Sequence, residues 1–278
     1  MRRLPRPWRW AGGSVLCAGA YFWAGWLGLS LPASNAHIST FWPAMGIALA
    51  VLVRWGPGLA PALFAGSLAI NVWAGLPAWL SAAIAAGNIG GPLMAAIWLN
   101  RAKLNLRLEQ KRDLLMLLGA GGLGATVLSA ANGAAWLAIG GHISTLQLPS
   151  AALAWWAGDT LGLFVAGIPL LTLNLSGIRQ AFGPGRRARS LLLLAGSGLS
   201  VLVALSMPAS LALPALALLL LPILLLVWLA MRAGVGPASA AVLAMAVAMV
   251  SATVAGAGPF VTSPPSGGAL LLTACWAC

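Results

Sequence analysis

The chain is a series of long apolar runs separated by short segments that contain charges or Gly/Pro turns. A helix that crosses the hydrocarbon core of a bilayer needs about 20 apolar residues, with about 17 to 25 tolerated. With breaks placed at the charges and turns, we expect nine helical segments and a tenth that the end of the chain cuts short. Their ranges are 10–31, 40–53, 57–74, 77–99, 114–139, 149–175, 190–207, 211–231, 235–255 and 268–278.

The second segment, residues 40–53, is short for a full crossing. Such a segment either tilts where the bilayer is thin or enters and leaves the membrane on one side. The sequence leaves both arrangements open.

The composition is typical of an integral membrane protein. Hydrophobic residues make up 61% of the chain and charged residues 6%, which is too few to cover the surface of a water-soluble domain. The 34 glycines and 14 tryptophans agree, because small residues let membrane helices approach closely and Trp prefers the lipid–water interface. We therefore predict an all-α fold, a polytopic membrane bundle of about nine to ten transmembrane helices. We expect residues 1–278 to form a single membrane domain with no soluble output domain, whose last segment, 268–278, is cut short.

The basic residues indicate the orientation of this bundle. All 15 lie before the first segment or between alternate pairs of later segments, so one side of the membrane collects every Lys and Arg. Because cytoplasmic loops are rich in these residues, we predict a cytoplasmic N-terminus and outer loops that contain His37 and His142. The net charge of +12 is spread over short clusters between apolar runs, which favours lipid headgroups over nucleic acid as the partner.

The first residues have a second interpretation. "MRRLPRPWRW", followed by an apolar stretch and "ASNA", resembles a secretory signal peptide with cleavage after Ala36. The apolar run is long enough to span a bilayer, so we favour a retained first helix.

Three strongly polar side chains fall inside the apolar runs. At a rise of about 1.5 Å per residue, Asp159, Asn88 and Asn132 lie about 15, 16 and 12 Å inside the outer ends of their segments. These segments are the fourth, fifth and sixth. If they are neighbours in the bundle, the three side chains can share one polar site.

Asp159 belongs to "WWAGDTLGLF", in a chain that has only three acidic residues. Trp155 and Trp156 precede it by four and three residues and so share its helical face, and Gly158 and Gly162 form a small-residue pair for close packing. We expect Asp159 to point into the bundle. It is either an interhelical hydrogen-bonding residue or, because an ionisable group in the membrane is costly, part of a functional site.

No arrangement of residues in the sequence indicates catalysis or metal binding. The glycine-rich stretch at 119–127 follows no strand and lies within an apolar run, so it fits close helix packing better than phosphate binding. We therefore expect no enzymatic activity, no cofactor and no bound metal.

Several short motifs follow one another in a family-specific order. "FWPAMGIALAVLV" (41–53), with Trp42, Pro43 and Gly46, resembles the W-P-x-x-G-I-A signature of the type-one membrane-associated sensor domains, the first MASE-type family. The stretches that resemble its later landmarks are "AGN" (86–88), "WWAGDTLGLFVAGIPLL" (155–171), "VWLAMRAGVGPA" (227–238) and "GAGPF" (256–260).

This resemblance implies a sensory domain of the bacterial inner membrane. Such a domain precedes a cytoplasmic histidine kinase, diguanylate cyclase or cyclic-di-GMP phosphodiesterase module, and this chain has no such module. We expect it to detect a small-molecule or membrane-borne signal and to pass it to an output in cis or to a partner protein in trans. The positions that the family motifs carry over are Trp42, Pro43, Gly46, Asn88, Trp156, Gly158, Asp159, Gly162, Gly258 and Pro259.

Our candidates for the sensing site combine the motifs with the depth argument, which alone contributes Asn132. The alternative function is a small ten-helix transporter built from two inverted repeats. Such a carrier should have matching halves, whereas "WPAMGIA" occurs once and the polar residues concentrate in the first six segments. The candidate sensing residues are Asp159, Trp155, Trp156, Asn88, Asn132 and Trp42.

Overall fold

A computed structural model describes residues 7–31, 37–207, 214 and 218–258. These residues form helices and turns without a β-strand, as the apolar pattern predicts. The chain divides into two compact units, Met1–Leu171 and Thr172–Cys278, which we describe one at a time.

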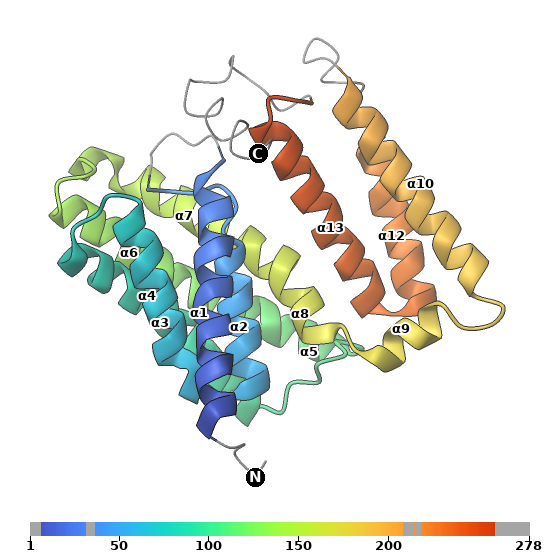
Figure 1. Ribbon diagram of the computed structural model, residues 1–278, viewed down its shortest axis with the longest axis horizontal. Coiled ribbons are helices and arrows are strands. Elements are labelled where there is room, and N and C mark those ends of the chain that lie inside the picture. Colours follow the sequence, from blue (N-terminus) through green and yellow to red (C-terminus); the bar gives the residue numbers. More distant parts are fainter. Residues whose placement is uncertain (1–6, 32–36, 208–213, 215–217, 259–278) are drawn as a thin grey trace. The chain divides into compact units, whose positions relative to one another are not determined.

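The first unit contains five predicted segments as helices or as continuous helical runs (Figure 1). A sixth run begins in this unit and ends at Thr172. The elements are α1 (Pro7–Leu29), α2 (Pro43–Trp55), η1 (Pro57–Leu59) with α3 (Ala60–Trp73), α4 (Ala78–Arg101), α5 (Lys111–Met116) with η2 (Leu117–Ala125) and α6 (Thr126–Ile139), and η3 (Thr145–Gln147) with α7 (Leu148–Gly162), η4 (Leu163–Gly167) and α8 (Ile168–Thr172).

Five helical runs of the described residues are long and apolar enough to cross a membrane. Three others, including α2, are shorter apolar helices. The full count of nine to ten crossings and the cytoplasmic N-terminus therefore stay predictions. The five runs are Ala78–Arg101, Lys111–Ile139, Thr145–Thr172, Arg187–Ser206 and Val235–Val254.

Helix α2 lies at the centre of the first unit. Pro43 starts it at a position where a missing N–H costs nothing, and Gly56, with a φ of 96°, ends it. Ten of its 13 residues are buried, and it contacts α1, α4, α7 and η4. A helix surrounded in this way needs apolar residues on every face, which explains the uninterrupted run "ALAVLV".

Two π-helical stretches, η2 and η4, interrupt the long runs of this unit. They pack together where Gly121 meets Leu163 and Gly122 meets Phe164, since a Cβ on either glycine would lie 3.0 to 3.1 Å from those side chains. A π-helical stretch carries one residue more per turn and is frequent at functional sites. The glycine-rich stretch at 119–127 thus packs closely against a neighbouring helix, as predicted, and most of it is π-helical.

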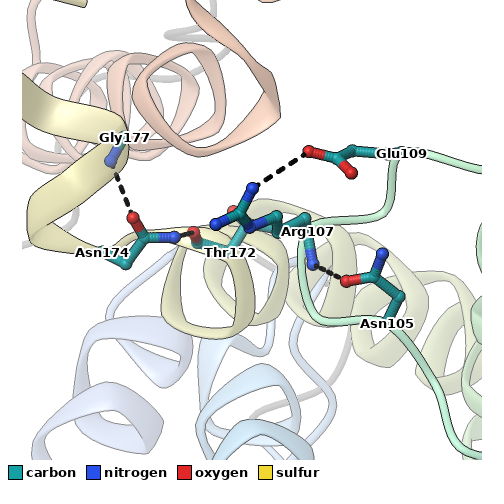
Figure 2. Close-up of polar contacts among 6 residues, drawn as sticks. All are labelled: Asn105, Arg107, Glu109, Thr172, Asn174 and Gly177. Atoms are coloured by element: carbon teal, nitrogen blue, oxygen red, sulfur yellow. Dashed lines mark hydrogen bonds and ion pairs between the residues drawn. The ribbon is translucent and has the colours of Figure 1, made fainter. Parts of the chain in front are cut away.

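The second unit is built from α9 (Leu175–Ala181), α10 (Arg187–Ser206), α12 (Leu220–Ala233) and α13 (Val235–Val254). Asn174 starts α9 by accepting a hydrogen bond from the Gly177 N–H at 2.7 Å (Figure 2). α12 packs against α10 and α13 around Leu193, Leu226 and Leu229. Parts of the predicted segment 211–231, and all of 268–278, lie outside the described residues.

The helices of this unit also present apolar side chains outward. Leu192, Leu199 and Leu202 on α10 are between 63% and 71% exposed. An apolar face of this kind is unfavourable in water and is typical of a surface covered by lipid or by another protein.

Candidate functional site

The family motifs meet where the segment before α2 crosses α7. The Trp42 N–H donates to the Gly158 carbonyl at 3.0 Å. A Cβ on Gly158 would overlap the Ser39 carbonyl oxygen, and a Cβ on Gly162 would overlap the Trp42 carbonyl. Gly158 and Gly162 therefore allow the backbone of residues 39–42 to lie directly against α7. This contact places Trp42 beside Asp159.

The same crossing continues along α2. A Cβ on Gly46 would overlap the Gly167 N–H and lie 2.6 Å from the Gly162 carbonyl. Pro43 and Gly46 thus have a shared role: the proline starts the helix, and the glycine lets its first turn touch η4.

Asp159 is buried, with 1% of its surface exposed. Among the described residues, the Ser129 hydroxyl and the Trp155 indole approach its carboxyl group, but neither oxygen has a hydrogen-bond partner. A buried acid without a partner is costly, so its position needs an explanation beyond packing. This carboxyl group is the most unusual polar group of the first unit.

Asn88 holds the polar surroundings of Asp159 in place. Its amide nitrogen donates to the Ser67 hydroxyl at 3.2 Å, and its oxygen accepts from the Ser129 hydroxyl at 3.1 Å. All three side chains are at most 2% exposed. Because both ends of the amide are in use, Asn88 ties together α3, α4 and α6.

A small cavity lies at this polar cluster. The centre of a water-sized sphere can move through a volume of about 20 Å³ in this cavity. The cavity therefore has room for about one water molecule. The lining residues combine one acid, two amides, a hydroxyl, an imidazole and two indoles with two apolar side chains. They are Leu29, His37, Ser39, Trp42, Asn71, Ala74, Asn88, Trp155 and Asp159.

Two of the candidate residues lie elsewhere. Asn132 does not line the cavity; its amide nitrogen donates to the Ala83 carbonyl at 2.9 Å and joins α6 to α4. The Trp156 indole donates to the Gly122 carbonyl of η2 at 3.1 Å and, unlike Trp155, does not line the cavity.

Several residues of the cluster were not among the sequence candidates. Ser67 and Asn71 lie four residues apart on α3, and the Asn71 amide donates to the Ser67 carbonyl at 2.7 Å. The buried Tyr21 hydroxyl has no hydrogen-bond partner among the described residues, and the side chains of Ser67, Trp42 and Asn88 lie near it. A search for polar residues at helical spacing inside segment 57–74 would have found the pair on α3.

The two histidines of the predicted outer loops meet at the cavity. The rings of His37 and His142 pack edge to face with their centroids 5.1 Å apart, and His37 lines the cavity. Burial lowers the pKa of His37 below its usual value of 6.5, and His142 lowers it further. His37 is therefore neutral at pH 7.

The remaining candidates lie outside the cluster. Gly258 has a φ of 96°, a backbone conformation that favours glycine, in the second unit. Pro259 lies outside the described residues. In the part of the chain that the structure describes, no group of three or more His, Cys, Asp or Glu side chains could hold a metal ion.

Comparison with known proteins identifies the family of the chain. The model of the MASE1 family matches residues 13–275, nearly the whole chain. No curated protein and no solved structure matches the chain. The chain therefore belongs to the MASE1 family of membrane-associated sensory domains.

Proposed function

We propose that this chain is a multi-pass sensory input domain of the bacterial inner membrane. It detects a periplasmic or membrane-borne signal and passes it to a cytoplasmic histidine kinase, diguanylate cyclase or phosphodiesterase, in cis or in a partner. Family membership supports the sensory role. The observation that carries the rest is the buried Asp159 carboxyl group beside a cavity, without a hydrogen-bond partner among the described residues.

The sensing site is the cavity with Asp159, Asn88, Trp42 and Trp155. An unpaired carboxyl group responds strongly to anything that neutralises it or donates to it, because the low-dielectric interior amplifies that change. Asn132 and Trp156 support this site by joining the helices that surround it.

The signal leaves the site along the helical run that carries Asp159. This run continues through η4 into α8, where the carbonyls of Leu170 and Leu171 accept hydrogen bonds from the Arg54 guanidinium. Gly46 and Arg54 thus attach the first turn and the last turn of α2 to the same run. When η4 changes between π and α geometry, α8 turns by about 100° relative to α7.

A chimera tests the sensory role. The full chain is fused to a diguanylate cyclase module, and cyclic-di-GMP is measured in cells that carry the parent or the Asp159→Asn variant. We expect the variant to lose regulation, either silent or permanently active, at an unchanged level in the membrane, because it removes the ionisable group but keeps the shape.

Asp113→Asn is the matched control. Asp113 is also buried, at 2% exposed, but its carboxylate accepts from the Asn105 N–H and does not line the cavity. If the Asp159→Asn chimera signals and responds as the parent does, the site assignment is wrong.

The transporter alternative gains no support from the described residues. The buried acid and amide side chains of the described residues all belong to the first unit, and the buried polar side chains described in the second unit are those of Thr172 and three serines. Two such units differ from the matching halves of an inverted-repeat carrier.

A further inference from the structure

The size of the Asp159 cavity restricts what can bind in it. Pockets for organic ligands measure roughly 300 to 1,000 Å³. This cavity has room for about one water molecule, so its occupant is an ion or a molecule of that size.

The charge around the cavity favours a cation. Asp159 supplies two carboxyl oxygens without partners in the described structure, and the cavity lining includes no Lys or Arg. The imidazole of His37, the other titratable group of the lining, is neutral at pH 7. A cation beside Asp159 would balance its charge inside the apolar surroundings, which no side chain of the lining does.

The other polar atoms of the lining are oxygen ligands. The Asn71 amide nitrogen donates to the Ser67 carbonyl, and the amide oxygen is an acceptor that can serve the cavity. The Asn88 oxygen accepts one hydrogen bond, from Ser129, and keeps a second lone pair. The Ser39 hydroxyl donates to the Gly28 and Phe41 carbonyls, and its oxygen accepts from the Phe41 N–H at 3.1 Å and keeps a second lone pair.

This ligand set selects among metal ions. Carboxyl, amide and hydroxyl oxygens suit hard cations rather than the softer transition metals. Ca²⁺ takes 6 to 8 oxygens, usually with several carboxylates, and Mg²⁺ keeps several waters of its own, for which this cavity has no space. A single carboxylate with neutral oxygens matches the charge of a monovalent ion.

We propose that the cavity is a binding site for a monovalent metal cation of about the size of Na⁺. Asp159 neutralises the ion, and the side-chain oxygens of Asn71, Asn88 and Ser39 complete its coordination. The inference that its occupancy is what the domain detects rests on the proposed sensory function, whereas the binding itself does not.

Equilibrium binding of ²²Na⁺ tests the site directly. The full chain is purified in lipid nanodiscs, and the ionic strength is held constant with N-methylglucamine chloride at pH 8, because protons compete with a cation for a carboxyl group more strongly at lower pH. We expect a single saturable site. Asp159→Asn should lower the affinity by at least about 100-fold, because it removes the charged partner of a buried ion.

Two further variants separate a specific site from general effects. Asn88→Leu should weaken binding by about tenfold, since it removes one neutral ligand. Asp113→Asn, a buried acid outside the cavity, should bind ²²Na⁺ as the parent does. Size-exclusion chromatography of each variant identifies the folded fraction on which binding is measured.

Two outcomes would overturn the cation site: no saturable ²²Na⁺ binding to the folded parent chain at pH 8, or equal binding to the Asp159→Asn variant. If the parent shows no ²²Na⁺ binding but its chimera still depends on Asp159, the sensory proposal stands and the cation is wrong. Saturable binding to a chain whose chimera ignores Asp159 would support the cation site and remove its sensory role.

Discussion

At the scale of single residues, the site depends on positions where a side chain is absent. Gly158 and Gly162 bring the backbone of residues 39–42 onto α7, and this contact sets Trp42 beside Asp159. A methyl group at either glycine has no space, because the atoms it would meet are backbone atoms, which cannot rotate aside. The glycines therefore determine the geometry of the polar cluster although they supply none of its chemistry.

Gly162→Ala should destabilise the folded protein by about 1 to 3 kcal/mol, the usual cost of overpacking. The measurement is the thermal midpoint in detergent, followed by fluorescence-detected size exclusion. Gly90→Ala is the control, since Gly90 lies within α4 and a Cβ there would meet nothing within 4 Å. Equal midpoints for the two variants would contradict the crossing described above.

At the scale of elements, α2 and the α7–η4–α8 run form the link between the site and the end of the first unit. α2 touches the run through Gly46 at its first turn and through Arg54 at its last. The contact at Arg54 satisfies carbonyls that have no partner within their own helix. In the proposed function, a change at Asp159 would therefore reach the end of α8 through both helices.

Arg54→Ala should uncouple the chimera without emptying the site. We expect cyclic-di-GMP output to lose its regulation while ²²Na⁺ binding stays within about twofold of the parent, because Arg54 does not line the cavity. The matched control is Arg112→Ala, since Arg112 is exposed and also donates to a carbonyl at a helix end, that of Ala102, at 3.0 Å. Loss of regulation in both variants would assign the effect to general helix-end stability.

At the scale of the whole molecule, the two units differ in the polar side chains that they bury. The first contains the two buried acids and the buried amides of the described structure, and the second is built from apolar helices with hydroxyl groups inside. Together with the exposed leucines of α10, this composition suits a unit that meets lipid or a partner protein in the membrane.

The orientation of the chain is open to a direct test. In a background where Cys17, Cys275 and Cys278 are replaced by Ala, cysteines at positions 37 and 142 should react with a membrane-impermeant reagent added outside the cell. A cysteine at position 107 should react only after the membrane is opened, because Arg107 belongs to a basic loop, where it pairs with Glu109 at 3.6 Å (Figure 2). The reverse pattern would place the N-terminus outside.

The sequence by itself determined which parts of the chain are helical. Apolar runs, and the charged, Gly and Pro residues that separate them, can be read from the local sequence. The helices α1, α3, α4 and α10 therefore lie where the runs predict them. The sequence also identified Asp159 as a candidate sensing residue, because an acid in an apolar run is unusual whatever surrounds it.

Only the tertiary structure decided which polar residues meet. Asn132 and Asn88 have similar depths, yet Asn132 binds the backbone of α4 while Asn88 lines the cavity. Trp155 and Trp156 were both predicted on the face of Asp159, but neighbouring residues point about 100° apart and the cavity takes in Trp155 alone of the two. Depth along a helix follows from the sequence, whereas rotation about its axis depends on which neighbours pack against it, and runs that are apolar on every face do not reveal that rotation.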